Sequence, residues 1–188
     1  MLIKIDFKEF KKLYKNHIVK DFPSTERPSF LGFRKRILKH KESVYIYEEE
    51  GQEKAYIILK EHDGYIFISF FAVYEEYRGE GIGTKALKEL EEKLRDKKGI
   101  VIEVENLKYA NSKEEKEMQK RRIKFYERLG FKIVTGLEVY LIAEYNIMIK
   151  AEEKIDANKA KMLMEDYYSS FLNKAIKKVL KFRINENI

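Results

Sequence analysis

Glycines at positions 79, 81 and 83 follow an apolar, strand-like run and open an amphipathic, helix-like segment. A glycine-rich backbone lets a ligand approach closely because no Cβ atom stands in the way. The first N–H groups of a helix have no partner inside the helix, and the helix dipole favours an anion beside them. The segment therefore predicts a phosphate-binding site at the start of this helix.

The spacing of these glycines separates three phosphate-binding patterns. A Walker loop ends in Gly-Lys-Ser/Thr, whereas this chain has Gly83-Thr84-Lys85 in a different order. A dinucleotide fingerprint needs a tight turn directly after the strand, but five residues separate the apolar run from the first glycine. The third pattern, Arg/Gln-x-x-Gly-x-Gly/Ala, is matched by Arg78, Gly81 and Gly83. That pattern is typical of loops that bind the pyrophosphate of coenzyme A.

The elements around this loop follow a mixed α/β pattern. Short β-branched and aromatic runs separated by glycine turns predict antiparallel hairpins, and apolar positions at helical spacing predict helices between them. Gly99 is expected to end the helix that the glycine loop opens. We expect helices over residues 6–20, 29–40, 83–97, 113–130 and 157–182. We expect strands over residues 43–48, 54–60, 65–73, 100–106, 131–134 and 139–150.

The last predicted helix, 157–182, carries two adjacent apolar rows that must be buried against something. We expect residues 1–150 to form one domain and residues 151–188 to form an extension that packs on that domain or on a partner in a homodimer. A helix lying on a membrane surface is the alternative. Tyrosine, serine and asparagine in the apolar rows disfavour it.

Composition excludes several classes of site. The 188 residues include no cysteine, which rules out a disulfide framework, a cysteine zinc site, an iron–sulfur cluster and a cysteine nucleophile. The three histidines have no metal-ligand spacing, so no metal is expected. The net charge of +7 is spread over alternating signs, which disfavours a nucleic-acid partner. Without a signal-like or membrane-spanning run, we expect a cytoplasmic protein with no membrane partner.

Three segments in order resemble the GCN5-related N-acetyltransferases, the GNAT family. They are AVYEEYRGEGIGTKAL (72–87), the strand IVIEVEN (100–106) and RRIKFYERLGF (121–131). With the loop DFPSTERP (21–28), they look like a largely uncharacterised bacterial branch. The resemblance covers roughly residues 1–150. It implies an α/β fold with a twisted, largely antiparallel mixed sheet flanked by helices, to which the C-terminal amphipathic helix is added.

The resemblance implies direct transfer of an acetyl group from acetyl-CoA to the primary amine of a small molecule or peptide. Because no cysteine can carry the acetyl group, a ternary complex is expected. By resemblance, backbone N–H groups at Phe71, Ala72 and Val73 contact the thioester carbonyl and the pantetheine arm. The remaining cofactor-binding candidates are Arg78, Gly79, Glu80, Gly81, Ile82, Gly83 and Thr84.

By resemblance, Tyr126 is the acid that protonates the thiolate; its alternative is a tyrosine packed in the core. Glu103 and Glu105 lie on one face of a predicted strand and are candidates for the base that accepts the amine proton. Alternatively, both glutamates pair with Arg121, Arg122 or a lysine. Many family members have an asparagine six or seven residues before the tyrosine, where this chain has Gln119 and Lys120.

Three further residues are candidates for the acceptor site, because the first helices and the loop after them shape that site in the family. These are Asp21, Glu26 and Arg27. Arg78 either neutralises phosphate or pairs with Glu75 or Glu76. Two other functions stay open: a non-catalytic sensor that binds acyl-CoA, and a basic protein associated with RNA or the ribosome.

Overall fold

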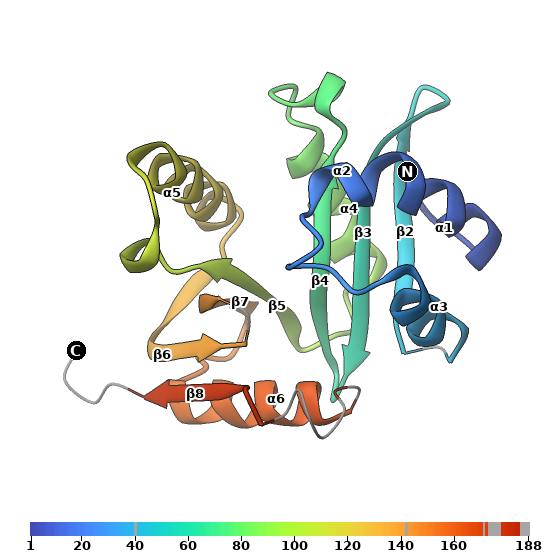
Figure 1. The fold of residues 1–188 in the computed structure, drawn as a ribbon. Coiled ribbons are helices and arrows are strands. Elements are labelled where there is room, and N and C mark those ends of the chain that lie inside the picture. The colour runs from blue at the N-terminus through green and yellow to red at the C-terminus, as the bar shows by residue number, and fades with distance from the viewer. Residues whose placement is uncertain (40, 142, 171, 173–177, 185–188) are drawn as a thin grey trace. The chain divides into compact units, whose positions relative to one another are not determined.

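The chain folds into two units, each built around strands with helices against them (Figure 1). The computed structural model describes residues 1–39, 41–141, 143–170, 172 and 178–184. The first unit comprises Met1–Glu61 and Ile66–Lys97, and the second comprises His62–Tyr65 and Lys98–Ile188.

The first unit has the strand order β1-β2-β3-β4. The pairs β1·β2 and β2·β3 are antiparallel, and the β2–β3 hairpin turns at Glu50 and Gly51, both with positive φ. This turn matches a two-residue hairpin connection. The strands are β1 (Leu2–Lys4), β2 (Ser43–Glu49), β3 (Gln52–His62) and β4 (Tyr65–Val73). The helices are α1 (Phe7–Leu13), the π-helical turn η1 (Tyr14–Ile18), α2 (Val19–Asp21), α3 (Phe30–Leu38), the 3₁₀ turn η2 (Glu75–Tyr77) and α4 (Ile82–Lys93).

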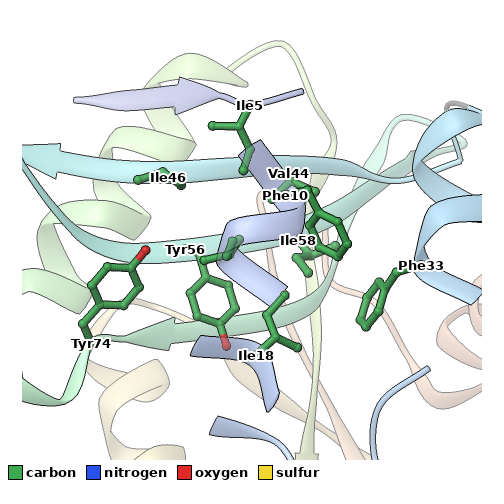
Figure 2. Packing of buried hydrophobic residues seen from close by; sticks show 10 residues of the cluster. Ile5, Phe10, Ile18, Phe33, Val44, Ile46, Tyr56, Ile58 and Tyr74 are labelled. Carbon is green, nitrogen blue, oxygen red and sulfur yellow. The ribbon is translucent and has the colours of Figure 1, made fainter. Parts of the chain in front are cut away.

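One face of the β2–β3 pair is covered by α1, η1 and α3. Phe10, Ile18 and Phe33 from these helices are fully buried against Val44 and Ile58 of the strands (Figure 2). Side chains alternate along a strand, so Tyr45 points to the opposite face. There Lys93 of α4 lies over the Tyr45 ring, 6.0 Å from its centroid. The buried face of α4 consists of Ile82, Gly83, Ala86, Leu87 and Leu90.

The second unit has the strand order β5-β7-β6-β8, and each of these pairs is antiparallel. α5 packs against β5, whereas α6 packs against β6 and β8. The strands are β5 (Gly99–Glu105), β6 (Lys132–Tyr140), β7 (Glu144–Ala151) and β8 (Lys181–Ile184). The helices are the 3₁₀ turn η3 (Leu107–Tyr109), α5 (Lys113–Arg128) and α6 (Ala157–Ser169).

The expected fold class, a mixed α/β protein with a largely antiparallel sheet flanked by helices, is confirmed. Two predicted boundaries in the middle of the chain were wrong. The helix predicted over 83–97 ends at Lys93, and Gly99 begins β5 instead of ending a helix. A Cβ on Gly99 would lie 2.6 Å from the Lys150 carbonyl oxygen, so close pairing of β5 with β7 is what requires this glycine.

The C-terminal part also differs from its prediction. The strand predicted over 139–150 is divided, because β6 continues to Tyr140 before the chain turns into β7. The helix predicted over 157–182 ends at Ser169, and Lys181–Ile184 instead forms β8 on the edge of β6. The predicted apolar residues at positions 171, 175 and 176 lie outside the described residues. Periodicity cannot reveal that a segment will find a free strand edge, since that edge is built from distant residues.

α6 has its apolar face buried within the second unit. Ala160, Met164, Tyr167 and Tyr168 are each at most 5% exposed. In the described part of the chain, no helix is long and apolar enough to cross a membrane. The division into residues 1–150 and 151–188 stays a prediction.

Candidate active site

The predicted phosphate loop forms the start of α4. Gly79 and Gly81 have φ values of 91° and 79°, and a Cβ on either would meet no atom within 4 Å. The left-handed backbone, and not crowding, therefore demands glycine at both positions. The space beside both α-carbons is open.

The N-terminus of α4 differs from those of the other long helices. Asp6, Ser29, Ser112 and Asp156 cap α1, α3, α5 and α6 through side-chain oxygens that accept from backbone N–H groups. Gly81 caps α4 with no side-chain hydrogen bond. Among the described helices of at least seven residues, α4 alone thus lacks a side-chain acceptor for its first N–H groups. A pyrophosphate fits this arrangement, because it supplies the acceptor oxygens and the negative charge that the helix start favours.

Arg78 precedes these glycines and pairs with a residue outside its own loop. Its guanidinium contacts Asp21 of α2 (Nη2–Oδ1, 2.9 Å) and donates through Nε to the Val73 carbonyl oxygen at 3.1 Å. Asp21 also accepts from the hydroxyl of the fully buried Tyr56 at 3.0 Å. Burial, followed by the charge of Asp21, raises the pKa of Tyr56. The alternative considered for Arg78 was a pair with Glu75 or Glu76; the ion pair in the structure is with Asp21 instead, and the phosphate role of Arg78 stays a prediction.

The C-terminal half of β4 contacts α3 and the segment that follows it. Ser69 Oγ donates to Glu42 Oε1 at 3.2 Å, and Arg36 of α3 pairs with the same carboxylate oxygen at 3.3 Å. The Phe70 ring packs on Phe33 of α3, with centroids 5.3 Å apart. The predicted N–H donors of residues 71–73 follow these contacts directly in the chain, and their role stays a prediction.

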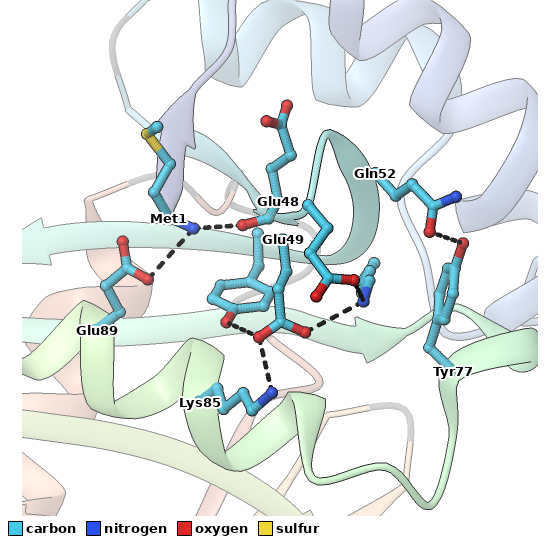
Figure 3. Close-up of polar contacts among 10 residues, drawn as sticks. Met1, Glu48, Glu49, Gln52, Tyr77, Lys85 and Glu89 are labelled. Carbon is cyan, nitrogen blue, oxygen red and sulfur yellow. Dashed lines mark hydrogen bonds and ion pairs between the residues drawn. The ribbon is translucent and has the colours of Figure 1, made fainter.

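A network of charges ties the first turns of α4 to the β2–β3 hairpin (Figure 3). Glu49 accepts from Lys85 of α4 at 2.7 Å, from Lys54 at 3.1 Å and from the Tyr47 hydroxyl at 3.3 Å. The hydrogen bonds from the two lysines lower the pKa of Glu49 to about 2. The carboxylate thus stays charged at neutral pH and holds the glycine-opened end of α4 against the hairpin.

The other predicted site residues lie in the second unit, where Tyr126 projects from α5. Tyr126 is 5% exposed, and its ring packs edge-on against Phe125 and Phe131 at 5.0 and 5.5 Å. Burial raises its pKa; Arg122 opposes this shift and Glu105 adds to it. The phenol is therefore protonated at neutral pH, as an acid must be. The same burial and ring contacts also agree with the alternative, a tyrosine packed in the core, so the catalytic role of Tyr126 stays a prediction.

The two glutamates of β5 have different partners. Glu105 forms an ion pair with Arg122 of α5, which is the structural alternative considered for it. Glu103 accepts from the Tyr168 hydroxyl of α6. Burial raises the pKa of Glu103 to about 7, and the Tyr168 hydrogen bond opposes that shift. A carboxyl group with a pKa near neutrality is suited to act as a general base.

Tyr168 is the residue near the candidate base that sequence reasoning missed. It was counted as one member of an apolar row with Met164 and Leu172. The only signal was its hydroxyl, since a buried tyrosine usually finds a hydrogen-bond partner. The identity of that partner depends on how α6 packs.

Gln119 occupies the position where many family members have an asparagine. Its side chain is in α5, the residue is 4% exposed, and Nε2 donates to Glu115 Oε1 at 3.0 Å. Among the described residues, nothing donates a hydrogen bond to its buried Oε1. A buried acceptor without a partner is costly. An amide N–H of a ligand would satisfy it, and a pantetheine arm carries such groups.

The acceptor-site candidates have partners within the chain. Arg27 donates to the Phe22 carbonyl oxygen at 3.0 Å and to the Tyr14 hydroxyl at 2.5 Å, so it fastens the loop 21–28 to the preceding helices. The Glu26 backbone N–H donates to the Pro23 carbonyl oxygen at 3.0 Å. Asp21 is bound to Arg78 as described. Contact with an acceptor stays a prediction for all three.

Comparisons with known proteins agree with this geometry. A family model described as an acetyltransferase (GNAT) domain matches residues 40–133, half of the chain. "Putative acetyltransferase YjbC" of Bacillus subtilis (strain 168) is 31% identical over 111 residues, which are 59% of this chain and 52% of that protein. The chain thus spans about half the length of this relative.

Solved structures share the fold at low sequence identity. A GNAT-family protein from Bacteroides thetaiotaomicron is 20% identical, with a TM-score of 0.71 over 93% of this chain and 99% of that one. Arabidopsis thaliana NAA60, solved in complex with acetyl-CoA, is 14% identical, with a TM-score of 0.57 over 81% and 98%. With the family model matched across the glycine loop and the fold shared, this chain belongs to the GNAT acetyltransferase family.

Proposed function

We propose that the protein transfers an acetyl group from acetyl-CoA to the primary amine of a small molecule or peptide. The observation that carries the proposal is the glycine-opened start of α4, whose N–H groups have no side-chain cap, in a chain of this family. The pyrophosphate would be bound there. Gln119 Oε1 would accept from an amide of the pantetheine arm, and the N–H groups of residues 71–73 would hold the carbonyl oxygen.

The two titratable groups of the second unit support the chemistry. The amine nitrogen forms a bond to the acetyl carbon, the carbon–sulfur bond breaks, and the sulfur leaves with the electron pair. Glu103, with a pKa of about 7, accepts the proton that the amine loses. Tyr126, a phenol kept protonated by burial, donates its proton to the thiolate. With no cysteine in the chain, the transfer is direct.

Calorimetric titration with acetyl-CoA tests the binding half of this proposal. We expect micromolar affinity for the wild type and a loss of at least about tenfold in Gly81→Ala, because alanine disfavours the left-handed backbone that aims the first N–H groups of α4. Gly51→Ala is the matched control. Gly51 has φ of 73° against 79° at Gly81, and neither Cβ would meet an atom within 4 Å. Equal affinity losses in both variants, or no binding by the wild type, would contradict the proposal.

Release of free thiol in the presence of a panel of amines tests the catalytic half. We expect thiol release that depends on the amine and is lost in Glu103→Gln, while acetyl-CoA affinity is retained. Binding of acetyl-CoA without thiol release for any amine would instead favour a sensor that binds acyl-CoA.

A further inference from the structure

Glu103 and the C-terminal helix meet at a single side chain. Tyr168 of α6 donates its hydroxyl hydrogen to Glu103 Oε1, across a sequence separation of 65 residues. The Tyr168 ring is 4% exposed and packs against Tyr167 and against Phe182 of β8, with centroids 5.2 and 6.4 Å away. These two ring contacts and the burial of the side chain hold the phenol in place, so its hydroxyl has a defined direction.

The helix that presents Tyr168 is itself firmly placed. Asp156 caps its N-terminus by accepting from the Lys159 N–H at 2.8 Å. Ala160 and Met164, which precede Tyr168 on the same face at steps of four, are 0% and 1% exposed. The contact with Glu103 therefore belongs to a packed interface within the second unit, and is not a chance approach of two surface side chains.

The residues next to Glu103 and Tyr168 lie on β5 and β7. On the strand of Glu103, Glu105 is held by Arg122 of α5. On β7, Ile147 is the register partner of Glu103, and Tyr145 lies close enough to act on Tyr168. Burial raises the pKa of Glu103, and the hydrogen bond from Tyr168 lowers it. Tyr168 thus stabilises the charged form of this carboxylate against burial.

We propose that Tyr168 is a positioning residue for the base Glu103, which makes the C-terminal helix α6 part of the acetyl-transfer machinery. This inference rests on the proposed function, in which Glu103 accepts the amine proton. The hydroxyl occupies one carboxylate oxygen and leaves the other to receive that proton. It also keeps Glu103 ionised at a lower pH than burial alone would allow.

The pH dependence of kcat/KM in Tyr168→Phe tests the inference. Without the hydroxyl, the pKa of Glu103 rises above its value of about 7, so the acid limb of the profile moves to higher pH. We expect the apparent pKa of the acid limb to rise by about one unit. At pH values below this pKa, kcat/KM should therefore fall about tenfold, and at higher pH it should return to the wild-type value. Acetyl-CoA affinity should be unchanged.

Tyr167→Phe is the matched control, since Tyr167 is the neighbouring residue of the same helix, is 5% exposed and loses the same hydroxyl. Its profile should overlie that of the wild type. An unshifted acid limb in Tyr168→Phe, or a rate lowered equally at every pH, would show a merely structural role and overturn the inference.

Two measurements keep the test decisive if Tyr168→Phe folds poorly. Phe182→Leu loosens the packing of the Tyr168 ring but retains its hydroxyl, and we expect a smaller shift in the same direction. An NMR titration of ¹³C-labelled carboxyl groups, with the Glu103 signal assigned by its loss in Glu103→Gln, follows the ionisation without turnover. If the wild type turns over but the pKa of Glu103 is the same in Tyr168→Phe, only the positioning role is refuted. If the wild type turns over no amine, the proposed function is refuted as well.

Discussion

At the scale of single residues, the second unit holds two titratable groups whose surroundings suit opposite tasks. Burial keeps the Tyr126 phenol protonated, whereas Glu103 has a pKa of about 7 and is divided between its two forms near neutrality. Such separated protonation states are how acid and base roles are assigned within one site. The burial that raises the pKa of Glu103 also makes its negative charge costly to the folded state.

Glu103→Gln is therefore expected to stabilise the protein at alkaline pH. The folded-state pKa of Glu103 is raised from 4.5 to about 7, so the native state holds this proton more tightly than the unfolded state. Wild-type stability falls as pH rises from 4.5 to 7, by about 3 kcal/mol for this group. Urea denaturation of the wild type and of Glu103→Gln at pH 4.5 and pH 8 measures their free energies of unfolding. If the difference between these two free energies is the same at both pH values, the expectation is contradicted.

Gln119→Ala is expected to weaken binding of the pantetheine part of coenzyme A only. Because a lost hydrogen bond to a buried group costs about 1–2 kcal/mol, affinity for coenzyme A should fall about tenfold. Affinity for 3′-phospho-ADP, which lacks the arm, should stay constant. Lys120→Ala is the control, since the Lys120 side chain pairs with Glu117 at 2.8 Å on the surface. If Gln119→Ala lowers the affinity for coenzyme A and for 3′-phospho-ADP equally, the substitution disturbs α5 in general and the expectation is contradicted.

At the scale of elements, capping and strand pairing place the candidate residues. The side-chain caps of α1, α3, α5 and α6 leave α4 as the described long helix whose start can accept an anion. In the second unit, the β5–β7 ladder places Glu103 opposite Ile147. That ladder depends on a close approach at its first residue, Gly99, where any side chain would collide with β7.

Gly99→Ala is accordingly expected to destabilise the second unit. The new Cβ would lie 2.6 Å from the Lys150 carbonyl oxygen and 2.7 Å from Ala151 Cβ, so the backbone must shift. Overpacking of this kind costs about 1–3 kcal/mol. The midpoint of urea unfolding measures the loss. Ala151→Gly in the same chain should restore part of it, and a midpoint within error of the wild type would show that β5 and β7 adjust freely.

At the scale of the whole molecule, the chain divides into two units that carry different parts of the predicted chemistry. The phosphate loop, Arg78 and Asp21 belong to the first, and Glu103, Tyr126 and Gln119 belong to the second. The matched family domain ends at residue 133, so α6 and β8 lie beyond it. The inference about Tyr168 therefore assigns a task to a segment outside the matched domain.

Direct transfer predicts the kinetic pattern of the whole protein. Because the chain has no cysteine, acetyl-CoA alone should leave its mass unchanged, and initial rates with both substrates should give intersecting lines. Mass spectrometry after incubation and a two-substrate rate matrix measure these outcomes. Parallel lines together with a stable mass increase of one acetyl group would establish a covalent intermediate.

Local patterns predicted much of this protein because their physical causes are local. Gly79 and Gly81 were identified from spacing alone, since a positive φ and a helix start require only neighbouring residues. The hairpin turns and the amphipathic helices followed from alternation and periodicity for the same reason. The partners that Arg78 and Glu103 have in the structure, Asp21 and Tyr168, were not among the alternatives considered, because only the folded chain brings these distant residues together.

By itself, the sequence determined the order of most elements, the uncapped glycine start of α4 and the likeness to one family. Tertiary structure alone decided that Arg78 binds Asp21, that Glu103 accepts from Tyr168 and that Lys181–Ile184 joins β6 as a strand. It also decided that Gln119 buries an oxygen to which none of the described residues donates a hydrogen bond. Each of these depends on which distant surfaces pack together and exclude water. Burial sets both the partners and the pKa values of polar groups, and burial exists only once the chain has folded.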